Sequence, residues 1–146
     1  MRCIMLFVER PRSLQAEHKQ GYQARLQEQA RTSMATNQLL AGELYARIAW
    51  FHSEKTKTDI DNIVKPILDA LNGVVYADDY QIVKCLSERV DTTKDFALSA
   101  SAASAEVYQE LVALLGNEQI KHIVYIEVGQ LSSRRIVFGP IDEEHL

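Results

Sequence analysis

The chain has 146 residues, of which 47% are hydrophobic and 25% charged, and it contains two cysteines. These values describe an ordinary globular domain that is long enough to bury a core, and they exclude a disordered chain and a disulfide-bonded scaffold. The formal net charge is −4, and all of it lies in residues 96–146, so the electrically balanced first 95 residues do not exclude a nucleic-acid partner.

The first predicted element is a buried strand over residues 3–9, "CIMLFVE", which ends before Pro11. Its apolar run from Cys3 to Val8 is too short for a membrane span or for the apolar region of a signal peptide. Cys3 and Cys85 both fall in apolar, strand-like runs, and we expect two reduced core residues. We therefore expect a cytoplasmic protein with no membrane partner.

A helix and a second strand are predicted next. Residues 15–35 are polar and rich in helix formers, which predicts one helix that is interrupted or begun at Gly21. After Gly42, residues 44–52, "LYARIAWFH", alternate with period two and are rich in aromatic side chains. This pattern is typical of a strand.

Residues 60–71 carry aliphatic side chains at spacings of three and four, the pattern of a helix that packs on a sheet. Asn72 and Gly73 supply its stop signal. A proline inside a helix removes a backbone hydrogen bond, so Pro66 must lie near the start. We expect Asp61 or Asn62 to be the N-cap, which places Pro66 at or just beyond the first turn.

The rest of the chain predicts a strand, an acidic turn and a strand over residues 74–90, and a short strand over 96–102. A helix follows over 105–117, with Val107, Leu111, Leu114 and Leu115 facing inward. Residues 120–128 and 134–139 predict a terminal β-hairpin. The whole indicates one α+β domain over residues 1–146, a two-layer sandwich of a small mixed sheet and helices, with a core of about 1–102 and an extension of 103–146.

Five aspartates lie close together in residues 57–81. If the chain is extended before the helix, Asp59 and Asp61 point the same way, and the turn with Asp78 and Asp79 can fold back beside them. Carboxylates this close repel each other unless a cation lies between them, and a hard divalent ion suits oxygen ligands. The alternative is that these residues cap a helix and form a turn.

A basic residue lies within the same segment. Asp61, Lys65 and Asp69 are four residues apart, so they share one helix face. Either the lysine forms an ordinary exposed ion pair, or its ammonium is held beside a metal ion. The four histidines show no ligand spacing, and we expect them to serve packing or to lie on the surface: His18, His52, His122 and His145.

Residues 58–83, "TDIDNIVKPILDALNGVVYADDYQIV", resemble the signature of the RusA-like family of Holliday-junction resolvases. That signature reads D-x-D-N, a lysine four residues after the second aspartate, then D-A-L and a D-D-x-Q turn. All of these elements are present. The strong part of the resemblance covers about 35 residues, and the elements over residues 3–52 fit the family more loosely.

The resemblance implies a function and a set of site residues. It places the family's metal ligands at Asp59, Asp61 and Asp79, its essential lysine at Lys65, and a possible auxiliary ligand at Asp78. It also implies a small α+β fold and a homodimeric endodeoxyribonuclease that depends on Mg²⁺, with Mn²⁺ as a possible substitute. The expected substrate is a four-way DNA junction, cleaved during recombination or repair in a bacterium or its prophage.

Two other functions stay open at this point. One is a catalytically idle DNA-binding or assembly protein that retains the motif for stability. In such a protein the acidic C-terminal segment would mask the basic surface that faces DNA. The other is a magnesium-dependent hydrolase of nucleotides or RNA, because a carboxylate cluster does not specify the polymer.

Overall fold

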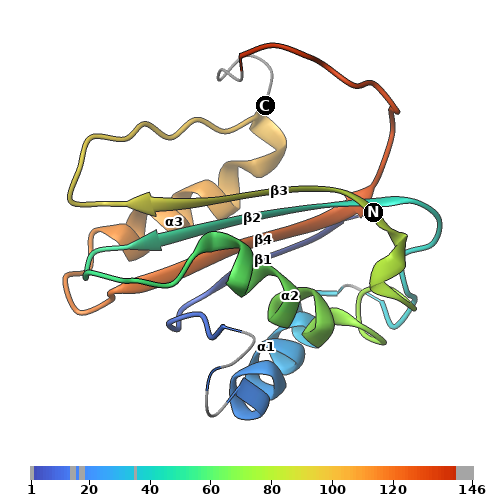
Figure 1. The fold of residues 1–146 in the computed structure, drawn as a ribbon, viewed down its shortest axis with the longest axis horizontal. Coiled ribbons are helices and arrows are strands. Elements are labelled where there is room, and N and C mark those ends of the chain that lie inside the picture. Colours follow the sequence, from blue (N-terminus) through green and yellow to red (C-terminus); the bar gives the residue numbers. More distant parts are fainter. Residues whose placement is uncertain (1, 14–15, 17–18, 35, 141–146) are drawn as a thin grey trace.

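The computed structural model describes residues 2–13, 16, 19–34 and 36–140. These residues form four strands, three α-helices and two short 3₁₀ turns, η1 and η2 (Figure 1). In chain order the elements are β1 Arg2–Phe7, α1 Lys19–Ser33, β2 Leu44–His52, α2 Ile60–Leu71, η1 Asp79–Gln81, β3 Ile82–Asp91, η2 Ala102–Ser104, α3 Ala105–Leu115 and β4 His122–Gln130. None of the helices in this part of the chain is long and apolar enough to cross a membrane.

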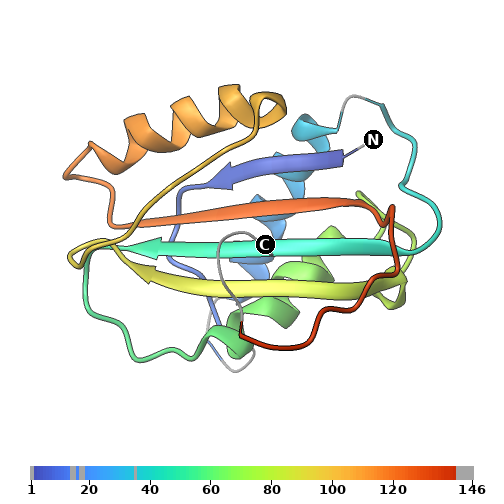
Figure 2. The same cartoon turned by 90° about the horizontal axis from the view of Figure 1, so that it is seen from above.

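The strands form one mixed sheet in the order β1-β4-β2-β3, and Figure 2 shows them side by side. β4 is antiparallel to both β1 and β2, and β3 is parallel to β2. His52 is paired with His122 at one end of β2, and Leu44 with Gln130 at the other. The C-terminal segment 103–146 therefore supplies a central strand of the sheet.

α1 and α2 cover one face of the sheet. Side chains alternate along a strand, and Leu44, Ala46, Ile48 and Trp50 of β2 all point to this face. Each is at most 2% exposed. They pack in one core with fully buried residues of the two helices, namely Tyr22, Leu26, Ile63, Ile67 and Leu71. The expected α+β architecture, a mixed sheet with a helical layer, is confirmed.

α3 packs on the opposite face of the sheet. A smaller core there contains Leu111 of α3 together with Ala49 and Phe51, the β2 residues that alternate with those of the main core. Val107, Leu114 and Leu115 also pack against it, so the predicted inward face of this helix is confirmed.

α2 begins earlier than predicted, because its N-cap is Asp59 and its first helical residue is Ile60. Pro66 therefore lies well inside the helix, beyond the first turn. Without an N–H, Pro66 cannot donate the usual hydrogen bond to the carbonyl of Asn62. The ring is buried, and the Pro66 carbonyl accepts a hydrogen bond from Gln23 Nε2 at 2.9 Å. Burial and this link to α1 offset the lost bond. The helix ends at Asn72 and Gly73 as predicted, with Gly73 at φ +79°.

Three predicted strands are not formed. Residues 74–77 make a tight turn after α2, in which the Gly73 amide donates to the Tyr76 carbonyl at 2.7 Å. Residues 96–101 are irregular, and residues 134–139 lie without a strand partner in an exposed segment. The terminal hairpin cannot form in the sheet because both edges of β4 are already paired, with β1 and with β2.

The two cysteines differ. Cys3 is a free, buried core residue as expected, whereas Cys85 is free but exposed. Cys85 belongs to β3, an edge strand of the sheet, where only part of the helical face is covered. Its assignment to the core was wrong, because an apolar run does not reveal whether a strand is central or at an edge. Residues 15, 17–18 and 35 of the predicted first helix, and His145, lie outside the described residues.

We predict that Ile67→Ala lowers the free energy of unfolding by about 2–5 kcal/mol, because it opens a cavity between α2 and the sheet. The matched control is Ile136→Ala, since Ile136 is 77% exposed. That change should cost less than about 0.5 kcal/mol. Urea denaturation measures both values, and equal losses for the two variants would contradict the assignment of the core.

Candidate active site

The acidic turn that follows α2 is fixed by its own side chains. Asp78 is the N-cap of η1, and its carboxylate accepts a hydrogen bond from the Tyr80 amide at 3.0 Å. The side chain of Gln81 closes the capping box, because its carbonyl oxygen accepts from the amides of Ala77 at 3.0 Å and Asp78 at 3.2 Å. Two side chains thus satisfy the amides of a turn that would otherwise be open to water.

Gln81 also ties this turn to a second loop. Its Nε2 donates to the carbonyls of Leu40 and Gly42, at 3.1 Å each. The Leu40 amide in turn donates to the Val75 carbonyl at 2.7 Å. The backbone of Asp79 is therefore held between α2 and the loop that leads into β2.

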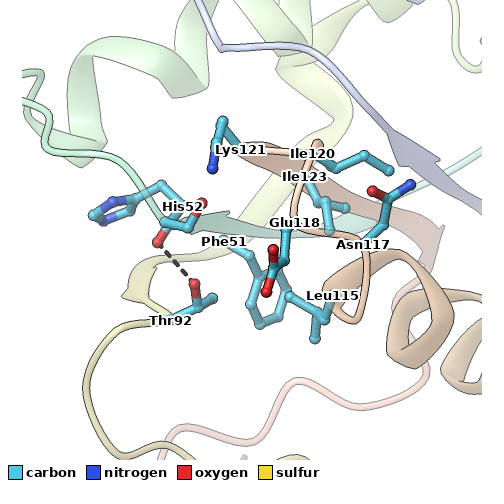
Figure 3. Close-up of a pocket in the computed structure, with 10 residues that line it drawn as sticks. Phe51, His52, Thr92, Leu115, Asn117, Glu118, Ile120, Lys121 and Ile123 are labelled. Atoms are coloured by element: carbon cyan, nitrogen blue, oxygen red, sulfur yellow. Dashed lines mark hydrogen bonds between the residues drawn. The ribbon is translucent and has the colours of Figure 1, made fainter.

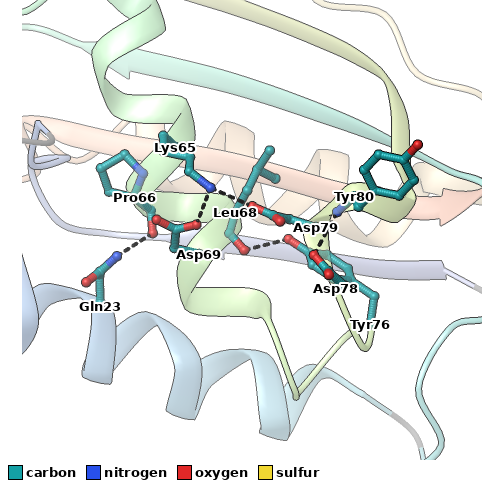
Figure 4. A network of polar contacts seen from close by, with 9 residues as sticks. All are labelled: Gln23, Lys65, Pro66, Leu68, Asp69, Tyr76, Asp78, Asp79 and Tyr80. Atoms are coloured by element: carbon teal, nitrogen blue, oxygen red, sulfur yellow. Dashed lines mark hydrogen bonds and ion pairs between the residues drawn. The ribbon is translucent and has the colours of Figure 1, made fainter.

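Lys65 brings α2 and the acidic turn together (Figure 4). Its Nζ lies 2.8 Å from Asp79 Oδ2 and 2.7 Å from Asp69 Oδ1. The side chain of Lys65 is 53% exposed, that of Asp69 37%, and that of Asp79 22%. The ammonium therefore keeps one side open to solvent while two carboxylates fix its position. Lys65 and Asp69 share one helix face as predicted, and they form the ion pair that was one of the two alternatives for Lys65.

These contacts shift the pKa of two groups. The hydrogen bonds that Lys65 donates to Asp69, first, and to Asp79 raise its pKa, so its charge is secure at neutral pH. The hydrogen bond from Lys65 lowers the pKa of Asp79, which is the less exposed of the two carboxylate partners of Lys65. Asp79 is thus an anion held in place by an adjacent cation.

The structure places Asp59 and Asp61 at the start of α2, both exposed. Asp59 is the N-cap and makes no side-chain capping bond, and Asp61 lies in the first turn. Asp59 has an extended backbone, with φ −70° and ψ 146°, but Asp61 is already helical, so the strand-like alternation expected for the two does not apply. Both carboxylates lie where the helix dipole favours negative charge.

The expected set of three carboxylates is not assembled in this structure. Within the described ranges, no three His, Cys, Asp or Glu side chains are grouped so that they could hold a metal ion. Asp79 contacts Lys65, which lies one helical turn after Asp61. The carboxylate of Asp78 is used to cap η1.

The donor chemistry nevertheless suits a hard divalent cation. Asp59 and Asp61 have exposed carboxylates without a hydrogen-bond or ion-pair partner among the described residues. Asp79, on the neighbouring turn, is already matched with a positive charge. Oxygen ligands of this kind are those that divalent cations such as Mg²⁺ prefer.

His52 and His122 serve packing, as expected. Both are buried and lie against Trp50, with ring centroids 5.4 Å and 5.9 Å from it. Trp50 Nε1 donates to His122 Nδ1 at 3.1 Å, and His122 Nε2 contacts Glu54. Burial is the main reason that the pKa of His122 is lowered, so the ring stays neutral.

A pocket of about 250 Å³ lies apart from the acidic site, between the ends of β2 and β4 and the end of α3 (Figure 3). Its walls are apolar side chains such as Phe51, Leu115 and Ile123, and its rim carries Glu118 and Lys121. None of the acidic residues of α2 or of its following turn lines this pocket. It contributes nothing to the acidic site.

Carboxylates and an ammonium on one surface of an α+β domain suit metal-assisted phosphodiester cleavage, and the comparisons identify the class of enzyme. The family model described as "Endodeoxyribonuclease RusA" matches residues 8–98, which is more than half of the chain. The protein is therefore a nuclease that belongs to the RusA family, whose members act on Holliday junctions with the help of a divalent metal ion. A comparison with curated proteins found no match.

The sequence did not reveal the structural roles of two residues, Gln81 and Asp69. The sequence analysis identified Gln81 only as a position of the family signature and assigned it no role. In the structure its side chain makes four hydrogen bonds that hold the acidic turn. Asp69 was considered only as a surface partner of Lys65, yet it fixes one side of the ammonium that meets Asp79. The signal for Asp69 was its spacing of four from Lys65.

We predict that Lys65→Met raises the pKa of Asp79 toward its ordinary value, because the cation that stabilises the carboxylate is lost. Since the folded pKa of Asp79 is lowered, this contact stabilises the protein at neutral pH. That contribution disappears as the pH falls through the pKa of the folded state. Titration of the Asp79 carboxyl carbon by NMR measures the shift. The control is Lys84→Met on the exposed part of β3, and an unchanged Asp79 titration in Lys65→Met would contradict the assignment.

Proposed function

We propose that this protein is a magnesium-dependent, structure-selective endodeoxyribonuclease that resolves Holliday junctions during DNA recombination or repair. The observation that carries the proposal is the Lys65–Asp79 ion pair, which unites the lysine and the last aspartate of the family signature on one surface. The family match over residues 8–98 supports cleavage of DNA rather than of another phosphodiester.

The carboxylates of Asp59, Asp61 and Asp79 would hold the metal ion, with Asp78 as a possible auxiliary ligand. When bound, Mg²⁺, or Mn²⁺ in its place, lowers the pKa of an attached water and offsets the charge of the phosphate. Asp79 is kept ionised by Lys65, so it is ready to act as a ligand at neutral pH. Asp59 and Asp61 are open to the same solvent.

Lys65 is suited to stabilise charge rather than to accept a proton. Its two carboxylate partners raise its pKa, so the amine stays protonated and cannot serve as a general base at neutral pH. The side of the ammonium that faces solvent can donate to a phosphate oxygen, where negative charge develops during attack. Asp69 keeps the ammonium in this position, so we assign Asp69 as a positioning residue.

We also propose a homodimer that works in the cytoplasm. A two-fold dimer presents two equal sites, and a four-way junction offers two equivalent strands for cleavage. Two free cysteines suit a reducing compartment. A bacterial or prophage source agrees with these properties.

We predict that Asp61→Asn abolishes metal-dependent cleavage of a synthetic four-way junction, because the amide cannot supply the charge that a divalent ion requires. The variant should fold and keep most of its DNA binding, since Asp61 is exposed at the helix start. A gel assay with Mg²⁺ and with EDTA measures cleavage, and circular dichroism checks the fold.

The matched control for Asp61→Asn is Glu110→Gln, which removes an exposed charge from α3. It should cleave normally. A folded Asp61→Asn variant that cleaves as fast as the wild type would refute the site. A wild-type protein that binds the junction in Mg²⁺ without cutting it would instead show an idle binding protein, and preferential cleavage of RNA or nucleotides would show another hydrolase.

We predict a particle of twice the 16.6 kDa chain mass in sedimentation experiments at micromolar concentration. The reason is that one monomer can cut only one of the two strands that resolution requires. An obligate monomer that nevertheless resolves junctions symmetrically would contradict the homodimer.

A further inference from the structure

Tyr80 is an exposed aromatic side chain on a fixed backbone. It lies between Asp79, the partner of Lys65, and Gln81, the anchor of the acidic turn. Its amide donates to the Asp78 carboxylate at 3.0 Å. The residue itself is 88% exposed, and Figure 4 shows its ring turned away from the other labelled side chains. The backbone is held and the ring is presented to solvent.

The ring of Tyr80 makes no contact that would explain it as a structural residue of the described part of the chain. Among the described residues, the hydroxyl group of Tyr80 makes no hydrogen bond and its ring contacts no other aromatic ring. Tyr76, four residues earlier, behaves differently, since it is fully buried and its hydroxyl donates to the Leu68 carbonyl at 2.6 Å. The stabilisation that an aromatic ring provides grows with its buried area, so a ring of a residue that is 88% exposed contributes little to stability.

The surroundings of Tyr80 indicate the kind of partner. Its neighbours in the turn, Asp78, Asp79 and Gln81, are polar, so the ring does not lie at the centre of an apolar patch of the kind that proteins bury against each other. It lies one residue from the Lys65–Asp79 pair, where the proposed function places a phosphate. Beside a phosphate, the flat apolar group of a DNA chain is the base.

We infer that Tyr80 is a stacking platform for an unpaired or unstacked nucleobase at the branch point of the junction. This inference rests on the proposed function. An aromatic ring stacks on any base, because every base has a π-face, and each such contact contributes about 1–3 kcal/mol. A branch point supplies a base that has lost a stacking neighbour, whereas a continuous duplex keeps its bases stacked. Tyr80 thereby favours branched over linear DNA.

The experiment compares Tyr80→Ala with the wild type in EDTA, so that binding is measured without cleavage. The substrates are a synthetic four-way junction with 2-aminopurine at the branch point and a linear duplex of the same sequence. We expect Tyr80→Ala to weaken junction binding about 5- to 150-fold, the equivalent of one lost stacking contact. Binding of the linear duplex should stay within about twofold, because backbone contacts are unchanged.

The fluorescence of 2-aminopurine reports the contact directly. The wild type should change the emission of the branch-point base through stacking, and Tyr80→Ala should not. Tyr80→Phe retains the ring and should behave as the wild type in both measurements. Phe138→Ala removes another exposed aromatic side chain, which is 90% exposed in the segment after β4, and should have no effect. Thermal unfolding should be the same for all variants.

The outcomes separate the inference from the proposed function. If Tyr80→Ala keeps the junction affinity and the emission change of the wild type, stacking by Tyr80 is wrong while the nuclease proposal stands. If Tyr80→Ala loses affinity for the linear duplex to the same extent, the ring does not select branched DNA and the inference is also wrong. If the wild type shows no preference for the junction over the linear duplex, the proposed function is wrong, and the inference that rests on it is wrong as well.

Discussion

The ion pair between Lys65 and Asp79 connects two parts of the chain that are 14 residues apart. It fixes the exposed face of α2 against the acidic turn, so that the charged groups of both occupy one surface. Its geometry depends on neighbours on each side. Asp69 holds the ammonium from within α2, and Gln81 holds the turn against the loop before β2. The site is therefore a property of several elements rather than of one motif.

The matched family segment does not form the sheet alone. Residues 8–98 contain α1, β2, α2 and β3, but β1 lies before this range and β4 lies after it. β4 is hydrogen-bonded to β2 along its full length and separates β2 from β1. Trp50 in the main core faces Val124 in this register. The part of the chain that carries the charged residues thus depends on the C-terminal strand for one of the two neighbours of β2.

Sequence patterns predicted much of this fold because local rules act on single elements. The strand at residues 44–52 and the helix after residue 104 are found where period and composition placed them. The patterns failed for segments whose structure depends on whether another strand is available to pair with them. The apolar residues near Val75 form a turn because the Gly73 amide donates to the Tyr76 carbonyl, and residues 134–139 cannot pair with β4, whose two edges are already bonded to β1 and β2.

The candidate site was predictable only in part. The spacing of four predicted that Lys65 and Asp69 share a helix face, and the family signature contained both Lys65 and Asp79 without indicating that they form an ion pair. The sequence could not show that α2 is capped at Asp59 and begins at Ile60, because Pro66 argued for a later start, and the longer helix depends on tertiary features, namely burial of the Pro66 ring and the hydrogen bond from Gln23.

The parallel pairing of β2 with β3 means that the chain between them must cross from one end of the sheet to the other. α2 and the acidic turn are that crossover. A descendant of this protein could not delete the segment without detaching β3 from its neighbour. Loss of activity during evolution would therefore leave the connection intact and alter only individual side chains. An inactive relative would be recognisable by a substituted aspartate in a crossover of unchanged length.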